Sequence, residues 1–227
     1  MTGKEMTGKD WHAWHDQYDD SGSALAQRLA VVQRQIRHAL DSCPPGPVRI
    51  VSICAGQARD LLGVLATHPR RKDVRARLVE LDPRNATAAR DGAVASGLSG
   101  IEVVVGDAAL TDHYAGMVPA KLVLACGVFG NITDADIERT IGYLPALCKW
   151  DGTVLWTRHR RSPDLVPLLC RWFGQRGFEL EFVTEPGTDF GVGAHRFTGS
   201  PRPLEMGHRM FTFIGRERLR QLGRSGS

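Results

Sequence analysis

Three short stretches place small or acidic side chains directly after apolar runs. The first, Cys54 to Ala58 (CAGQA), follows the run VRIVSI, while Glu80 ends a second run and Asp107 follows a third. Small residues let a ligand approach the main chain closely, and an ionised carboxylate accepts two hydrogen bonds, as a ribose diol requires. An acid at Asp107 suits an exocyclic amine such as adenine N6. Together the three stretches predict a clamp for a nucleoside.

Such a clamp needs elements that bring the three stretches to one edge. Apolar runs alternate with helical segments after residue 47, which favours a parallel, doubly wound α/β sheet with helices on both faces. The expected strands are 48–54, 75–81, 101–105, 122–126, 153–157, 178–184 and 208–214. The expected helices are 57–68, 83–97, 133–147 and 163–175, with a further helical region at 11–41. The last two strands are expected to be antiparallel, joined by a long Gly- and Pro-rich loop at 185–207.

The first stretch resembles the opening motif of the class I S-adenosylmethionine-dependent methyltransferases. That motif is an acid, any residue, and then three glycines at alternate positions. Here Ser52 holds the place of the acid, and Cys54, Gly56 and Ala58 hold the places of the glycines. The runs CAGQARD and CGVFGNI are similar to those of actinobacterial methyltransferases, which we take to be of small-molecule type. The resemblance implies a Rossmann-like, seven-stranded sheet with an antiparallel last strand.

The resemblance also implies how the cofactor S-adenosylmethionine, and its product S-adenosylhomocysteine, would be held. The ribose acid of the family falls on Glu80, with Asp82 as the alternative. The adenine-side acid falls on Asp107, and Ala108 beside it offers a backbone contact. The residues expected at the cofactor are Tyr18, Cys54, Ala55, Gly56, Ala58, Glu80, Asp82, Asp107, Ala108 and Cys126.

The end of the fourth strand, residues 126–131, is where the family places the methyl group to be transferred. Lys121 replaces the acid that usually begins this motif. The expected reaction is an in-line displacement in which a lone pair of the acceptor attacks the methyl carbon. Asn131, His159 and His195 are the candidates for positioning or deprotonating the acceptor, since histidine exchanges protons near neutral pH. Arg158 or His159 could also orient an anionic or phenolic acceptor.

The segment WHAWHDQYDD, residues 11–20, combines aromatic, acidic and histidine side chains before the first long helix. N-terminal helices often cover the cofactor in the resembling family, so Tyr18 is expected to reach its methionine carboxylate. The alternative is a helix docked by Trp11 and Trp14. The expected divisions are 1–10, a flexible N-terminus or a cloning scar; 11–47, a helical cap; 48–215, the Rossmann-like domain; and 216–227, a flexible basic tail.

Composition excludes several other classes of protein. The chain has 227 residues, of which 42% are hydrophobic and 24% charged, as in a globular domain and unlike disordered, collagen-like or coiled-coil chains. No apolar run reaches the roughly 20 residues that span a bilayer, and no apolar signal segment opens the sequence. The five widely spaced cysteines indicate free thiols, a cytoplasmic location and no metal site.

The mild net charge of +4 and the scattered basic residues favour a small-molecule acceptor over nucleic acid. An NAD(P)-dependent oxidoreductase is disfavoured, because its G-x-G-x-x-G fingerprint would put Arg59 where close packing requires glycine. A nucleic-acid methyltransferase and a cofactor-binding protein without methyl transfer stay open as alternatives. We expect a monomer or a homodimer, with no membrane partner.

Overall fold

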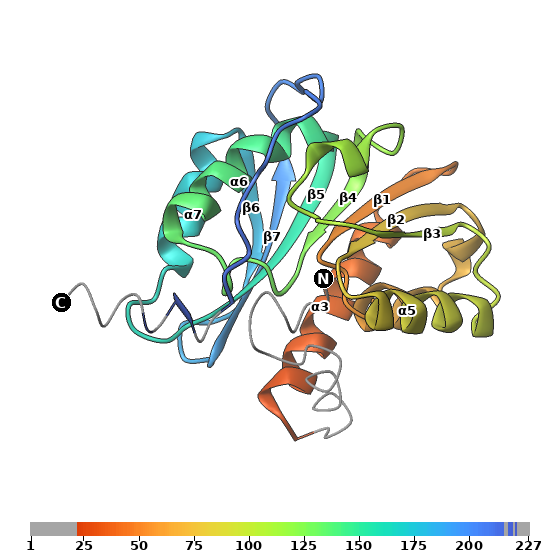
Figure 1. Cartoon of the computed structure of the whole chain (residues 1–227), viewed down its shortest axis with the longest axis horizontal. Helices are drawn as coiled ribbons and strands as arrows, with labels where there is room; N and C mark the ends of the chain where they lie inside the picture. The colour runs from red at the N-terminus through yellow and green to blue at the C-terminus, as the bar shows by residue number, and fades with distance from the viewer. Residues whose placement is uncertain (1–21, 216–217, 220, 222–227) are drawn as a thin grey trace.

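A computed structural model describes residues 22–215, 218–219 and 221 of the chain. Seven strands form one sheet in the order β3-β2-β1-β4-β5-β7-β6 (Figure 1). Their bounds are β1 Val48–Ile53, β2 Val74–Glu80, β3 Ile101–Val105, β4 Ala120–Ala125, β5 Cys148–His159, β6 Phe178–Val183 and β7 Phe190–Phe197. The strands β1 to β5 pair in parallel, whereas β7 is antiparallel to both β5 and β6. The predicted doubly wound, Rossmann-like sheet is therefore confirmed.

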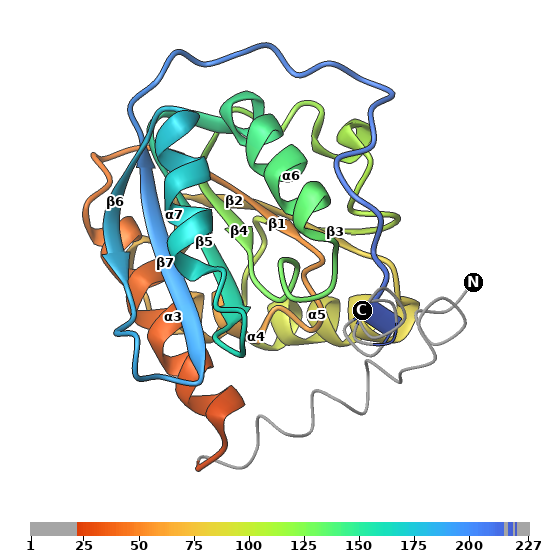
Figure 2. The same cartoon turned by 90° about the vertical axis from the view of Figure 1, so that its left-hand side faces the viewer.

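Helices cover both faces of this sheet, and each face has its own apolar core (Figure 2). The described helices are α3 Ala24–Asp41, α4 Arg59–Leu65, α5 Pro83–Ala95, α6 Asp134–Leu147 and α7 Val166–Gln175, with short 3-10 turns at η2 Pro69–Lys72 and η3 Thr111–Tyr114. The core under α6 and α7 includes Phe129 and Phe173, and the core under α3, α4 and α5 includes Ile36 and Leu61. Because the central strands have helices on both faces, β1 and β4 are buried from their third residue onward and carry no polar alternation there.

Helix α3 belongs to the second of these layers. Its side chains Val32, Ile36 and Leu40 are buried in the core that α4 shares, and Ser23 caps its first turn through the amide of Ala26. The described part of the expected 11–47 cap is thus packed against the sheet. The boundaries of the cap stay a prediction.

The last strand differs from the prediction. Residues 208–214 form no strand, and β7 lies instead inside the stretch expected to be a loop. The glycines that suggested a loop serve packing, because a Cβ at Gly191 or Gly193 would clash with Val166 or with the ring of Trp156. Glycine within a strand often marks such a close approach.

Residues 207–215 form instead a C-terminal strap that crosses the loops after β3 and β4. The amide of Met210 donates to the carbonyl of Ala109 at 2.8 Å. The amides of Ile214 and Gly215 both donate to the carbonyl of Asn131 at 3.0 Å. Met210 and Phe211 are buried in the core under α6. The segment that was predicted to be a strand is therefore bonded to loops and enters the core through Met210 and Phe211.

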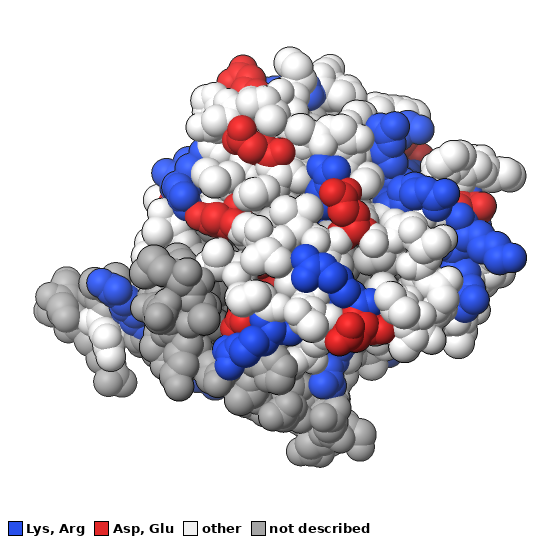
Figure 3. Space-filling view, turned by 45° about the vertical axis from the view of Figure 1, so that its right-hand side comes forward, with Lys and Arg blue, Asp and Glu red and all other residues white. Residues whose placement is uncertain are grey.

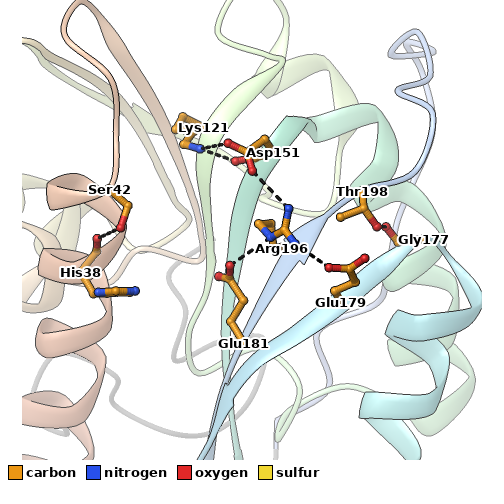
Figure 4. A network of polar contacts seen from close by, with 9 residues as sticks. All are labelled: His38, Ser42, Lys121, Asp151, Gly177, Glu179, Glu181, Arg196 and Thr198. Atoms are coloured by element: carbon orange, nitrogen blue, oxygen red, sulfur yellow. Dashed lines mark hydrogen bonds and ion pairs between the residues drawn. The ribbon is translucent and has the colours of Figure 1, made fainter.

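A charged network lies at the amino edge of the sheet, where β4 begins (Figure 4). Lys121 donates to the carboxylate of Asp151 at 3.1 Å, and Arg196 on β7 contacts Asp151, Glu179 and Glu181. Lys121, which replaces the family's acid, is therefore occupied in linking β4 to β5. It lies at the edge opposite the carboxyl ends of the strands.

Candidate functional site

The loop after β1 adopts an unusual backbone. Cys54, Gly56 and Ala58 have φ angles of 54°, 57° and 54°, all in the left-handed region. Only glycine enters this region freely, and other residues pay about 1–2 kcal/mol of strain there. The three left-handed positions alternate, as the three glycines of the resembling motif do. The backbone therefore keeps the form of a glycine loop even where the side chains have changed.

This spacing also bears on the oxidoreductase alternative. A G-x-G-x-x-G alignment puts its third glycine at Arg59, which is the first residue of α4. The left-handed residue is the preceding one, Ala58, which is also buried. The backbone thus supports the alternate-position alignment of the loop.

Glu80, at the end of β2, holds this loop in place. One carboxylate oxygen accepts from the amide of Gly56 at 2.8 Å, and the other accepts from the amide of Asp82 at 2.9 Å. Burial raises the pKa of Glu80, although the amides of Asp82 and Gly56 oppose that shift. Each oxygen keeps a second lone pair, so this arrangement leaves acceptor capacity for ribose hydroxyls. The ribose role stays a prediction.

Asp82, the alternative ribose acid, is engaged elsewhere. It caps α5 by accepting from the amide of Arg84 at 2.9 Å, and its carboxylate also pairs with the Arg84 guanidinium. Its side chain is 1% exposed. The structure thus gives Asp82 a capping role; which of the two acids binds a ribose stays a prediction.

Asp107 lies in the loop after β3 and joins the site to the strap. Its Oδ1 accepts from the amide of Ala109 at 3.0 Å, and its Oδ2 pairs with Nη1 of Arg209 at 2.7 Å. Beside it, the carbonyl of Ala108 accepts from the Tyr114 hydroxyl at 2.7 Å. The predicted adenine-side acid is therefore oriented by a residue about a hundred positions away.

The loop after β4 is held by two polar side chains. The hydroxyl of Thr157 on β5 accepts from the amide of Gly127 at 2.8 Å, and the side-chain amide of Asn131 donates to the Gly127 carbonyl at 2.6 Å. Asn131 is buried and also anchors the strap through its carbonyl. Its contacts therefore shape the loop where the resembling family transfers the methyl group.

Two cysteines flank the site at the ends of neighbouring strands. Cys54 follows β1 and Cys126 follows β4, and burial raises the pKa of both thiols well above the ordinary value. Acidic neighbours, Glu80 for Cys54 and Asp60 for Cys126, raise these pKa values further. The thiolate is the nucleophilic form of cysteine. Both residues therefore behave as small apolar lining groups.

His159 ends β5 at the same edge. Its ring lies 3.7 Å from where a Cβ would stand on Gly130, in the loop after β4. The neighbouring Arg158 donates to the carbonyl of Phe129 in that loop. The structure therefore brings His159 next to the loop containing Asn131; its role toward an acceptor stays a prediction.

His195 is a correction. It lies within β7, pairs with Val154 in the middle of the sheet, and is 0% exposed. Trp156 donates to its Nδ1 at 3.1 Å, and its ring stacks on Phe173 with centroids 4.2 Å apart. Burial lowers its pKa to about 3. His195 is a core residue away from the carboxyl edge, so the loop assignment that made it a candidate base was wrong.

Tyr18, together with the rest of residues 11–20, lies outside the described residues. Neither Arg209 nor Thr157 was predicted as a site residue, because each acts through a contact with a distant part of the chain. Among the described residues, no group of three or more histidine, cysteine or acidic side chains could hold a metal ion. Nor is any of the described helices long and apolar enough to cross a membrane.

No family model and no curated protein matches the chain. Several solved structures match its fold. An O-methyltransferase family protein from Burkholderia thailandensis superposes with a TM-score of 0.61 at 16% identity, over 78% of this chain and 57% of that one. Magnesium protoporphyrin IX methyltransferase from Synechocystis PCC 6803, with bound S-adenosylmethionine, gives 0.61 at 10% identity, over 83% and 98%. The [4+2]-cyclase SpnF gives 0.54 at 13% identity, over 76% and 81%.

These likenesses define the class of fold. The chain has the seven-stranded, Rossmann-like fold of class I methyltransferases, with its antiparallel seventh strand. It spans less than two thirds of the Burkholderia protein.

Proposed function

We propose that this protein is an S-adenosylmethionine-dependent methyltransferase with a small-molecule acceptor. The observation that carries the proposal is the loop after β1, whose residues 54, 56 and 58 are all left-handed. Two of them, Cys54 and Ala58, are not glycine and hold this form at a cost in strain. Strain of this kind persists where the surroundings impose it, often at ligand sites.

The residues present fit this cofactor. Glu80, at the end of β2, contacts the loop after β1 and keeps acceptor capacity on both oxygens. Asp107 follows β3, which lies beside β2 in the sheet. Ligands of open α/β sheets bind beyond the carboxyl ends of the strands, where the strand order reverses. Here the order reverses between β1 and β4. The loop after β1 and the loop containing Asn131 flank that point.

In this proposal the bound cofactor supplies a methyl group on a positively charged sulfur, so that acceptor attack breaks the carbon–sulfur bond and leaves a neutral thioether. The chain's own contribution is to align the two reactants and exclude water. Alignment of this kind is worth about 7–11 kcal/mol in well-oriented systems. Thr157 and Asn131 fix the loop after β4. In this proposal His159, which lies next to that loop, takes a proton from an acceptor that arrives protonated.

The mixed surface supports a small-molecule acceptor. On the face shown in Figure 3, acidic and basic side chains are interspersed, although basic ones gather at its right-hand side. A nucleic-acid binding face usually carries a continuous basic patch. All five cysteines are free, which supports a reducing compartment such as the cytoplasm.

A second candidate is a cofactor-binding enzyme that transfers no methyl group. It is favoured by the likeness to a structure described as a [4+2]-cyclase. Both candidates predict cofactor binding, and only the first predicts turnover to S-adenosylhomocysteine with an acceptor.

The test is calorimetric binding of S-adenosylhomocysteine to the wild-type protein and to Glu80→Gln. We expect Glu80→Gln to weaken binding by about 1–3 kcal/mol, because a charge-assisted bond to the ribose is lost. Glu102→Gln, on the exposed side of β3, is the matched control and should bind as the wild type does. Absence of binding to the wild type at millimolar concentration would overturn the cofactor assignment.

A further inference from the structure

A run of basic residues ends β5 beside the loop after β4. The side chain of Arg158 is 10% exposed, and that of Arg160 is 5% exposed. Arginine is rarely buried unless its charge is paired. The partners of these two buried guanidinium groups therefore indicate whether one of them is kept for a ligand.

Arg160 has a close acidic partner. Its Nη1 lies 2.7 Å from the carboxylate of Asp164, and its Nη2 donates to the carbonyl of Thr184 at the end of β6. Its main-chain amide donates to the carbonyl of Asp189 in the β6–β7 turn. These bonds tie the β6–β7 hairpin to β5, so the role of Arg160 is structural.

Arg158 is compensated far less well. Its Nη1 donates to the carbonyl of Phe129, which fixes one side of the guanidinium. Its Nη2 lies 3.5 Å from Oδ1 of Asp134, whose side chain is 59% exposed. Its Nε, like that of Arg160, is buried, and no acceptor within the described part of the chain bonds to either; the two arginines differ in the closeness of their acidic partners. An ion pair at this distance with an exposed partner is worth little.

Arg158 lies against the loop between β4 and α6. Phe129 and Asp134 flank Asn131, in the segment that runs from the end of β4 to the first turn of α6. This is the loop where the proposed function places methyl transfer. Nε and one Nη of a guanidinium together form a planar fork that matches the two oxygens of a carboxylate or phosphate.

We propose that Arg158 recognises an anionic group, a carboxylate or phosphate, on the acceptor, and that this group displaces Asp134 from the guanidinium. The assignment of the anion to the acceptor rests on the proposed function, whereas the anion preference of Arg158 does not. The carbonyl of Phe129 holds the cation from one side, and Asp134 occupies the other side until the anion arrives. Burial also lowers the pKa of Arg158 from its ordinary value, because removal from water disfavours the charged guanidinium. The nearest oxygen of Asp134 is 3.5 Å away and offsets little of this penalty.

The test uses benzoate, phenyl phosphate and the neutral analogue benzamide as probes, titrated by ligand-observed NMR with and without S-adenosylhomocysteine. The wild-type protein should bind the two anions at least about ten-fold more tightly than benzamide. Arg158→Gln should abolish this preference. Asp134→Asn should raise the anion affinity several-fold, because the competing carboxylate is removed. Arg161→Gln, an exposed neighbour, should change neither.

Equal binding of benzamide and the anions, or a preference that survives in Arg158→Gln, would overturn the proposal. If thermal melting shows that Arg158→Gln does not fold, Arg158→Lys and Asp134→Asn decide. An Asp134→Asn protein with unchanged anion affinity would then refute the role of Arg158. An anion preference in a protein that fails to bind S-adenosylhomocysteine would leave Arg158 assigned and refute the proposed function alone.

Discussion

Buried His195 should make this protein sensitive to acid over a defined range. Burial lowers its pKa to about 3 in the folded state, whereas an unfolded chain gives histidine a pKa near 6.5. Below pH 6.5 the unfolded state therefore binds more protons, so stability falls as the pH falls, down to about pH 3. At 1.36 kcal/mol per pKa unit, the loss relative to pH 8 is about 2 kcal/mol at pH 5 and approaches about 5 kcal/mol below pH 3.

The assay is urea denaturation at pH 8, 7, 6 and 5 on the wild type and on His195→Phe. The substitution keeps the aromatic stacking on Phe173 but leaves the Trp156 N–H without its acceptor, so we expect about 1–3 kcal/mol lower stability at pH 8. That deficit should shrink by about 2 kcal/mol by pH 5, because the variant has no imidazole to protonate. Carboxylates titrate in both proteins and cancel in the difference.

His208→Gln is the matched control, since its imidazole is exposed on the strap. Between pH 8 and pH 5 its free energy of unfolding should fall as much as that of the wild type. A deficit of His195→Phe that stays constant from pH 8 to pH 5 would refute the reasoning. It would mean that His195 accepts a proton within the folded protein, for example through local opening of β7.

Three further results are expected. Ala58→Val should lower the free energy of unfolding by about 2 kcal/mol or more and abolish S-adenosylhomocysteine binding, whereas Ala58→Gly should stay within about 1 kcal/mol, because a β-branched residue resists a left-handed φ and glycine does not. Gly193→Ala should cost about 1–3 kcal/mol in urea denaturation through its clash with Trp156; a neutral result would mean that the ring has room to move. Arg209→Gln should weaken calorimetric S-adenosylhomocysteine binding by about two- to five-fold with little change in melting temperature, since exposed ion pairs contribute at most about 1 kcal/mol; unchanged affinity would show that Arg209 does not orient Asp107.

The parts of the fold and site that depend on neighbouring residues could be predicted from the sequence. Apolar runs predicted six of the strands in place, and parallel strand ends put Glu80 and Asp107 at one edge. The loop at residues 54–58 could be found because small residues directly follow a strand. Its left-handed backbone could only be inferred by resemblance, since Cys54 and Ala58 do not normally mark such a conformation.

The parts that failed depend on contacts between distant segments. Gly191 and Gly193 suggested a loop, because nothing near them in the sequence shows that Val166 and Trp156 pack against them. His195 was misplaced for the same reason. Asp107 and Arg209 are separated in the sequence by the strands β4 to β7, so no local sequence pattern predicts their pairing.

The strand order also determines when each strand can pair as the chain is synthesised. Within the described sheet, β6 is hydrogen-bonded only to β7, which lies between it and β5. Because the chain leaves the ribosome from its N-terminus, β6 must wait unpaired until the strand after it has been made. The strap is made later still, and it carries the partner of Asp107 and the amides bonded to Asn131. A nascent chain can thus bury much of its core while the edge that we assign to chemistry is unfinished, so cofactor binding should appear only after the strap has left the ribosome.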